Sequence, residues 1–249
     1  MHPSPPPRRS SKRPPASLAS LTSLTSLASL REEVVACRAC PRLVAWREAA
    51  EASRPAGFPP APYWARPLPG LGDPSARLVL VGLAPAQHGG NRTGRMFTGD
   101  RSGDFLFAAL HRAGYANQPE SVSSDDGLTL SGAYVTAAVR CAPPANRPTP
   151  SERDSCAHFL VEELALLSQA RAFIALGQFA YESLLRSRAL GVAAPMPRPK
   201  FAHGLEIDLP GGRTLVCSYH PSQRNVFTGL LTAAMFDAVL SRAASLAAN

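Results

Sequence analysis

The sequence predicts an α/β protein, a three-layer α/β/α sandwich with a central, mostly parallel sheet of roughly four strands. One reason is the continuous apolar run at residues 76–83, which ends in Gly-Leu-Ala-Pro and is typical of a strand buried on both faces. The other is that such apolar runs alternate with segments of helical spacing along most of the chain. Alternating strands and helices predict a parallel sheet with helices on both of its faces.

Each expected element has its own signal in the sequence. Further strands are expected at 134–139, 172–176, 205–209 and 214–219, where short apolar runs stop at turn-forming or polar residues. The apolar spacing predicts helices at 102–113, 151–168, 179–188 and 227–247. Ser151 and Asp154 form the capping box that we expect to open the second of these helices. Ligands of such sheets bind beyond the carboxyl ends of the strands, so a site is expected in the segments that follow them.

Length and composition allow one ordinary domain with a tail. The chain has 249 residues, of which 45% are hydrophobic, enough to bury a sizeable core. Its net charge is +8, but residues 1–31 contain five basic residues and no acidic ones, so the remainder is only +3. A basic tail on a mildly basic domain suits a polyanionic partner, although it serves solubility equally well.

The first thirty residues have low complexity. A Pro/Ser/Arg segment is followed by leucines at every third position from Leu18 to Leu30, a period that makes no steady apolar stripe on a helix. We therefore expect residues 1–30 to form a disordered basic tail, with helix starting near Ser26, and residues 31–249 to form a single domain. The arginine pair near the start has no apolar signal region after it, and no run is long enough to span a membrane. These features predict a cytoplasmic protein without membrane attachment.

Four of the five cysteines form a close pair and a distant pair. Cys37 and Cys40 are separated by two residues, and Cys141 and Cys156 by fourteen, about a hundred residues further along. Such spacing can clamp two remote segments around two disulfides, a zinc ion or an iron–sulfur cluster. Disulfides fit poorly because nothing indicates secretion. The long second spacing favours a cluster over zinc but leaves both open. Cys217, in an apolar run, is expected to be a small buried hydrophobe.

Two segments at predicted strand ends contain the residues suited to chemistry. Residues 82–100 include several glycines, which allow sharp turns and a close approach of the backbone to a ligand. His220 directly follows the strand at 214–219 and is itself followed by Pro-Ser. A histidine there can be an ordinary edge residue, but opposite a glycine-rich loop it is expected to belong to a site.

These segments together resemble the uracil-DNA glycosylase superfamily, and within it the type 5 iron–sulfur branch. The resemblance is carried by Gly-Leu-Ala-Pro-Ala at 82–86, Asn-Arg-Thr-Gly-Arg-Met-Phe-Thr-Gly-Asp at 91–100, the Val-Arg-Cys-Ala-Pro-Pro-Ala-Asn-Arg-Pro-Thr-Pro segment at 139–150 and Tyr-His-Pro-Ser at 219–222. It covers roughly residues 33–245. It implies a monofunctional hydrolase that flips uracil, hypoxanthine, xanthine or a related base out of double-stranded DNA and cleaves its N-glycosidic bond. The product is an abasic site.

The resemblance also implies roles for individual residues. The four paired cysteines, Cys37, Cys40, Cys141 and Cys156, are the ligands of a structural 4Fe–4S cluster in such proteins. His220 is expected to stabilise the anion that develops on the departing base. Asp100 is the candidate catalytic acid, and its alternative role is the N-cap of the helix that begins near Ser102. Phe97 resembles the aromatic residue that stacks on the base, and its alternative role is a core residue beneath the loop.

The chain departs from other branches at the positions that read the base or activate water. Ala84, after Gly82 in the base-binding loop, replaces a polar residue, and Ala137 replaces a base-reading asparagine. Loss of that asparagine is expected to broaden the range of bases. Asn146 and Asn225 are the remaining candidates for polar contacts with base or water.

Contacts with DNA are expected from the segment after the histidine. Arg224, Val226 or Phe227 could enter the minor groove and fill the gap left by the flipped base, in the manner of wedge side chains. Residues 186–203 are expected to form a surface loop. The partner is double-stranded DNA with a damaged base, and we expect a monomer. Rival interpretations are a non-catalytic nucleic-acid-binding module held together by metal or cluster, and an electron-transfer protein, whose cluster ligands would be more closely spaced.

Overall fold

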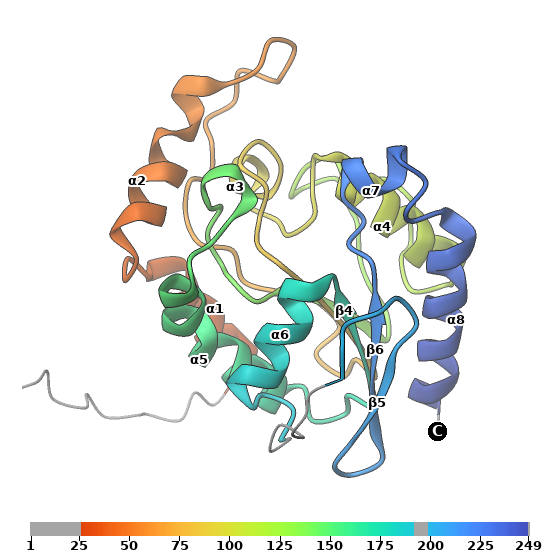
Figure 1. Ribbon diagram of the computed structural model, residues 1–249. Coiled ribbons are helices and arrows are strands. Elements are labelled where there is room, and N and C mark those ends of the chain that lie inside the picture. The colour runs from red at the N-terminus through yellow and green to blue at the C-terminus, as the bar shows by residue number, and fades with distance from the viewer. Residues whose placement is uncertain (1–25, 192–198, 249) are drawn as a thin grey trace, which may run out of the picture.

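A six-stranded sheet lies at the centre of the structure, a computed structural model that describes residues 26–191 and 199–248 (Figure 1). The strands are β1 (Leu71–Gly72), β2 (Leu78–Gly82), β3 (Ala133–Ala137), β4 (Ala172–Leu176), β5 (Glu206–Leu209) and β6 (Arg213–Ser218). Their order is β1-β3-β2-β4-β6-β5. The four inner strands are parallel and the two edge strands antiparallel. The predicted parallel sheet is confirmed, with β1 as an addition.

Helices cover both faces of this sheet. They are α1 (Leu27–Ala36), α2 (Pro41–Ala49), α3 (Gly90–Thr93), α4 (Arg101–Arg112), α5 (Pro150–Leu166), α6 (Gln178–Ser187), α7 (Gln223–Phe227) and α8 (Ala233–Ala248), with the 3₁₀ turns η1 (Ala50–Ser53) and η2 (Pro144–Asn146). Apolar residues of α4 and α8 form one core with the sheet, and those of α5 and α6 form the other. Figure 1 shows α8 and α6 on opposite sides of the strands. The three-layer α/β/α sandwich is therefore confirmed.

The period of two along β2 explains why this strand lies between two cores. Leu78 and Leu80 point to the side covered by α4 and α8. Val79 and Val81 point to the side covered by α5 and α6. All four are completely buried, as expected for a central parallel strand with helices on each face.

The C-terminal helix differs from the prediction. Residues 227–247 do not form one helix, because α7 ends at Phe227 and α8 begins at Ala233. Gly229 has a φ of 71°, a left-handed conformation that ends helices, and Leu231 then turns into the core. The break places α7 at the carboxyl end of β6, as a separate short helix.

The capping box of α5 differs from expectation, whereas the predicted start of helix near Ser26 is confirmed by α1. The capping box of α5 is made by Thr149 and Glu152, two residues before the predicted pair, with Pro150 at the first helical position. Helix α1 begins at Leu27 with Ser26 as its N-cap, so the predicted domain boundary at residue 31 falls inside a helix. Leu30 is buried against α5, which explains why this helix forms.

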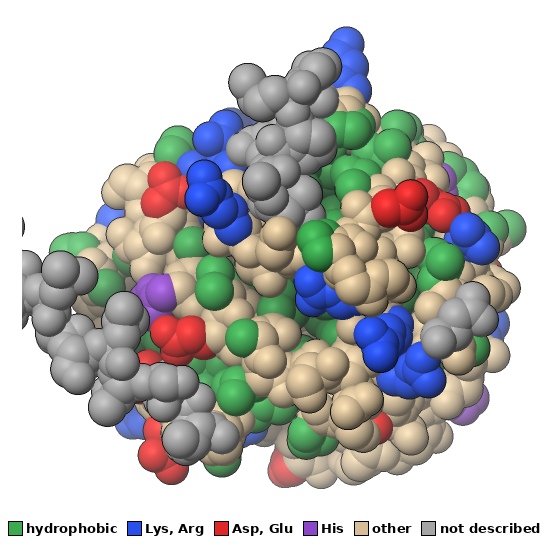
Figure 2. All heavy atoms as spheres, turned by 90° about the horizontal axis from the view of Figure 1, so that it is seen from below, with side chains coloured by type: hydrophobic (Ala, Val, Ile, Leu, Met, Phe, Trp, Pro, Cys, Tyr) green, Lys and Arg blue, Asp and Glu red, His purple; other side chains and the backbone are tan. Residues whose placement is uncertain are grey.

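Residues 1–25 lie outside the described part of the chain, and so do residues 192–198 of the predicted surface loop. Among the described helices, none has both the length and the apolar character needed to cross a membrane. The face at the amino ends of the strands, seen from below in Figure 2, carries basic side chains in separate groups among acidic and hydrophobic ones. The described residues of this face therefore form no single basic surface of the kind that a polyanion would need.

Candidate active site

A cavity of about 520 Å³ opens at the carboxyl ends of β2 and β6. Four segments line it: residues 83–86 after β2, Phe97 and residues 100–102 at the start of α4, Asn146 on η2, and His220 with residues 222–224 after β6. This is the position at which a parallel sheet with helices on both faces binds its ligands. The glycine-rich loop and the His-Pro-Ser segment, far apart in sequence, thus meet in one pocket.

His220 is placed by the end of β6 and by the chain that follows it. Its backbone carbonyl accepts a hydrogen bond from the Asn225 side chain, at Nδ2, over 2.9 Å. Ser222 caps the short helix α7, because its hydroxyl group accepts a hydrogen bond from the backbone N–H of Asn225. A Cβ on Gly177 would lie 3.0 Å from the Cβ of His220, so the glycine permits this close approach. The position of the imidazole is therefore determined by two neighbouring segments.

The His220 side chain is neutral at physiological pH. Burial lowers its pKa to about 4, because the charged imidazolium would lose its hydration inside the pocket. No residue in the described ranges forms a hydrogen bond with its ring. A neutral imidazole with a free N–H can donate a hydrogen bond to an oxygen that enters the pocket.

Phe97 lies beside this imidazole and carries backbone strain. The two ring centroids are 6.2 Å apart, with an angle of 28° between the ring planes. Phe97 has a φ of 51°, in the left-handed region that non-glycine residues rarely adopt. A Cβ on Gly82 would lie 2.6 Å from Phe97 Cζ, so the ring covers the end of β2 at a point where a side chain would collide. Phe97 is packed with the core and also lines the pocket, so both predicted interpretations describe part of its environment.

Asp100 caps helix α4 and faces the same pocket. Its Oδ1 accepts hydrogen bonds from the backbone N–H groups of Ser102 and Gly103 at 2.9 and 3.1 Å, which confirms the capping role. Burial raises the pKa of this carboxyl group, although the two N–H donors act in the opposite direction. Oδ2 lies against Gly89, where a Cβ would come within 2.0 Å. One carboxylate oxygen thus stabilises the helix, and the group still lines the pocket.

The remaining predicted base contacts divide into lining and supporting residues. Ala84 and Asn146 line the pocket, and Asn146 adopts a left-handed φ of 55° on an exposed turn. Gly82 supports the Phe97 ring from below. Asn225 is not among the lining residues, because its amide is engaged with the His220 carbonyl. Asn225 therefore stabilises the segment that contains His220.

The two predicted DNA contacts lie on the short helix after the histidine segment. Arg224 lines the pocket. Phe227, at the end of α7, is 73% exposed, and Leu230, which follows in the chain, is 47% exposed. Leu230 was missed because the sequence predicted it inside a continuous helix. Arg101, Ser102 and Gln223 also line the pocket, and their only sequence signal was their position next to the motifs.

The four paired cysteines converge on a second, much smaller cavity. All four line a space of about 20 Å³ between α1, α2 and α5, together with Arg140. Cys37 and Cys40 flank the connection from α1 to α2, Cys141 follows β3, and Cys156 lies on α5. Within the described residues no group of three or more His, Cys, Asp or Glu side chains is arranged to hold a metal ion. Cys217 is completely buried in β6, as predicted for a small hydrophobe.

Two buried arginines next to the cysteine cavity have unsatisfied N–H groups. Arg47 is only 1% exposed and donates from Nη1 to Cys141 Sγ at 3.1 Å and from Nη2 to the Cys37 carbonyl at 3.2 Å. Its Nε has no partner, and neither does Nε of Arg140. Buried donors without acceptors are costly. Arg47 thus directs N–H donors at the cysteines, an arrangement that fits an anionic group bound by them.

Comparison with known proteins shows the family of the chain. A sequence model of the uracil DNA glycosylase superfamily matches residues 69–244. The chain is 53% identical over 216 residues to a type-5 uracil-DNA glycosylase of Thermus thermophilus, an alignment that covers 87% of this chain and 96% of that protein. The chain belongs to the type-5 uracil-DNA glycosylase family.

Further relatives of the same type agree with this membership. A type-5 uracil-DNA glycosylase of Mycobacterium tuberculosis is 53% identical over 212 residues, covering 85% of this chain and 78% of that protein. One from Mycobacterium leprae is 52% identical over 219 residues, covering 88% and 94%. The superfamily match includes every segment that lines the pocket, so the pocket of this type-5 family member lies in the shared domain.

Proposed function

We propose that this chain removes uracil from double-stranded DNA by hydrolysing the bond between the base and the sugar, and that it also removes other deaminated bases. The observation that carries this proposal is a half-buried, neutral His220 that lines the same pocket as the neighbouring Phe97 ring. The type-5 uracil-DNA glycosylases to which the chain is similar support the choice of uracil. The enzyme would leave an abasic site in the DNA.

The pocket suits a nucleotide that has left the double helix. A base inside a duplex cannot be reached, so it must be rotated out at a cost of a few kcal/mol. A cavity of about 520 Å³ has room for such a base and part of its sugar. The Phe97 ring offers an aromatic surface for stacking, which compensates in part for the lost stacking in the duplex.

His220 supplies the stabilisation of the leaving group. As the N-glycosidic bond breaks, its electron pair stays on the base, and negative charge develops on the ring carbonyl oxygen. A hydrogen bond donated by the neutral imidazole stabilises this charge more in the transition state than in the bound substrate. Because the pKa of His220 is about 4, the ring donates as imidazole rather than as imidazolium at neutral pH.

Asp100 acts on the other side of the broken bond. The sugar becomes an oxocarbenium-like cation, and a water oxygen forms the new bond to its anomeric carbon. An ionised Asp100 carboxylate stabilises that cation and accepts a proton from the water. The base takes up a proton after departure, so the net reaction adds one water across the bond. The raised pKa of Asp100 makes it a better proton acceptor than an exposed aspartate.

Two positions near the pocket offer no polar group that would restrict it to one base. Ala84 lines the pocket without a polar side-chain atom, and Ala137 at the end of β3 is completely buried. Without a polar side chain at these two positions the pocket would discriminate less strongly, because rejection of an analogue depends on leaving buried polar groups unpaired. This supports activity on hypoxanthine and xanthine besides uracil.

The exposed residues on α7 support a duplex substrate. Arg224 is placed for a phosphate contact, and Phe227 projects from α7 as an apolar group that could fill the gap in the base stack. We expect the protein to act as a monomer. We expect the protein to act on chromosomal DNA in the cytoplasm of a bacterium.

We further propose that Cys37, Cys40, Cys141 and Cys156 bind a 4Fe–4S cluster. The four thiolates of a cubane are bound to four separate irons and so lie farther apart than the ligands of one zinc ion. The bound cluster would carry negative charge, and the buried Arg47 with its unpaired Nε would offset it. Its role is to join α1, α2 and α5 to the end of β3. Iron and sulfide analysis of protein purified without oxygen should give about four irons per chain. Stoichiometric zinc without iron would contradict this assignment.

Duplex oligonucleotides, each with a single uracil, hypoxanthine or xanthine, test the proposed reaction. Under single-turnover conditions we expect abasic sites, revealed by alkaline strand cleavage, with uracil and at least one other deaminated base. Tight binding of the same duplexes without base release would instead support the non-catalytic nucleic-acid-binding module.

A further inference from the structure

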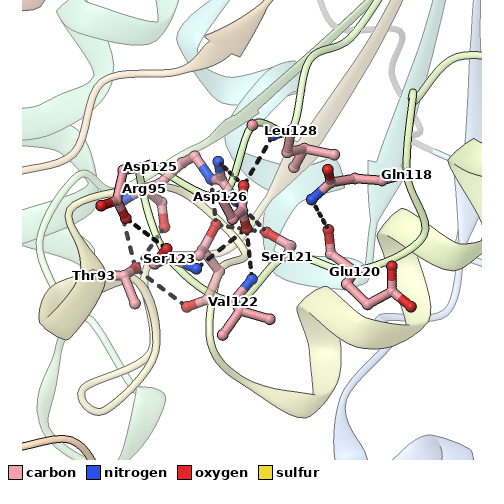
Figure 3. A network of polar contacts seen from close by, with 12 residues as sticks. Thr93, Arg95, Gln118, Glu120, Ser121, Val122, Ser123, Asp125, Asp126 and Leu128 are labelled. Carbon is pink, nitrogen blue, oxygen red and sulfur yellow. Dashed lines mark hydrogen bonds and ion pairs between the residues drawn. The ribbon is translucent and has the colours of Figure 1, made fainter.

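An ion pair joins the glycine-rich loop to a second loop, residues 121–128 (Figure 3). Arg95 donates from Nη1 to Asp126 Oδ1 at 2.8 Å and from Nη2 to Asp126 Oδ2 at 2.6 Å. The two side chains are only 11% and 13% exposed. A bidentate pair between arginine and a carboxylate with little access to water defines both the distance and the orientation of the two loops.

Asp126 also organises its own loop. Its carboxylate accepts hydrogen bonds from the backbone N–H groups of Val122, Ser123 and Leu128 at 2.8, 3.2 and 2.9 Å. Burial alone would raise its pKa, but Arg95 and these N–H donors outweigh burial and lower it. Figure 3 shows the carboxylate at the centre of these contacts. The loop is therefore a rigid support that stays charged at neutral pH.

The contacts with this support lie on both sides of Phe97. Arg95, two residues before it, donates from Nε to Thr98 Oγ1 at 2.9 Å and from Nη2 to Ser121 Oγ at 3.0 Å. The Thr98 and Ser121 hydroxyl groups are 2.8 Å apart, and the Gly99 N–H donates to the Ser121 carbonyl at 2.8 Å. The segment around Phe97 is thus bonded to loop 121–128 before and after the strained residue.

Phe97 is the residue that needs such support. A left-handed conformation of a bulky residue costs free energy and persists only where the surroundings impose it. Asp100, further along, is held separately by the first turn of α4. Loss of the ion pair would therefore be felt first at Phe97, whose ring forms part of the pocket wall next to His220.

We propose that Arg95 and Asp126 are positioning residues for catalysis, which hold Phe97 in its left-handed conformation so that its ring is ready to stack on the flipped base. Neither residue lines the pocket, and they act through Phe97. The inference rests on the proposed excision of uracil. It gives a role to Arg95, which lies within the motif at 91–100, and to Asp126, which lies outside the motifs.

A double-mutant cycle tests whether the effect passes through Phe97. Single-turnover excision from a uracil duplex is measured for the wild type, Arg95→Met, Phe97→Ala and the double variant. We expect Arg95→Met to slow excision by about tenfold in the wild-type background, the order of magnitude of one strained residue released. In the Phe97→Ala background the same substitution should change the rate by less than about twofold, since the residue it positions is gone.

Arg242→Met is the matched control, because Arg242 makes a bidentate pair with Glu206 on the exposed surface. It should leave excision unchanged. If Arg95→Met does not fold, as judged by circular dichroism, Arg95→Lys and Asp126→Asn replace it in the cycle. Equal losses in both backgrounds, or no loss in the wild-type background, would overturn the inference. A wild-type protein without excision activity would instead contradict the proposed function.

Discussion

Ionisable side chains are shielded from water at two places next to the sheet. At one place they are paired with opposite charges, and at the other they are not. Between β3 and α5, Arg140 and Glu163 form an ion pair at 2.6 Å, and both side chains are almost inaccessible. Glu163 also accepts hydrogen bonds from Tyr134, Thr136 and the Gly70 amide. In the pocket, His220 and Asp100 are half-buried and have no charged partner in hydrogen-bond contact.

The difference separates a structural use of buried charge from a chemical one. In the Arg140–Glu163 network each charge has a countercharge, so its removal is expected to affect folding. In the pocket, burial without a countercharge shifts both groups toward their neutral forms, which lowers the pKa of His220 and raises that of Asp100. Unpaired titratable groups in a cavity remain available to a substrate.

The largest expected effect is on the network side. Glu163→Gln keeps the shape of the side chain but leaves Arg140 buried without a carboxylate. Removing one partner of a buried pair costs about 3–5 kcal/mol. For a domain of this size, we expect the thermal unfolding midpoint to fall by on the order of 10 °C.

Glu206→Gln provides the contrast, because its partner Arg242 is at the surface. Its unfolding midpoint should change little. An equal effect of both substitutions would mean that burial does not distinguish these pairs, and the proposed structural role of the network would be wrong.

On the pocket side, His220→Ala should slow single-turnover excision by roughly a hundredfold or more, the effect of losing one preorganised transition-state donor. Duplex binding and the unfolding midpoint at neutral pH should change little. The measurements are excision rates with excess enzyme, together with the affinity for the duplex that contains the uracil. If binding and rate fell equally, His220 would be a binding residue rather than a catalytic one.

Asp100 should give a pH dependence that His220 does not. Excision needs an ionised Asp100 and a neutral imidazole. As the pH falls, Asp100 is expected to become protonated, because burial raises its pKa above that of an ordinary aspartate. The pKa of His220 is lowered to about 4, so its ring stays neutral down to about that pH. We expect Asp100→Asn to lower the rate about tenfold and to remove the acidic limb of the pH–rate profile. A limb that persists in this variant would belong to another group and would leave Asp100 with its capping role alone.

The smallest expected effect is on stability, from a substitution in the Arg140–Glu163 network. Tyr134→Phe removes a hydrogen bond of 3.0 Å to Glu163, which keeps its bonds to Arg140, Thr136 and the Gly70 amide. The free energy of unfolding should fall by about 1 kcal/mol, the usual net value of one hydrogen bond. Urea unfolding monitored by circular dichroism measures it. A loss as large as that of Glu163→Gln would show that the network depends on every member.

Much of the fold could be predicted because local patterns report burial. The apolar runs of β2, β4 and β6 are buried on both faces, and the sequence indicated this directly. The meeting of the glycine-rich loop with His220 also followed, since parallel strands bring their carboxyl ends to one edge of the sheet. The identity of the pocket residues depended on motifs, each of which lies within a short stretch of chain.

Only the tertiary structure decided which distant groups pair and where the backbone bends. The left-handed φ of Phe97 and the Arg95–Asp126 pair that supports it have no local sequence signal. The same is true of the Arg140–Glu163 network and of the break after α7, where Leu231 turns into the core. The physical reason is that periodicity along the chain records how often a residue faces the core. It does not record which charge, ring or carbonyl group from a remote segment it will meet there.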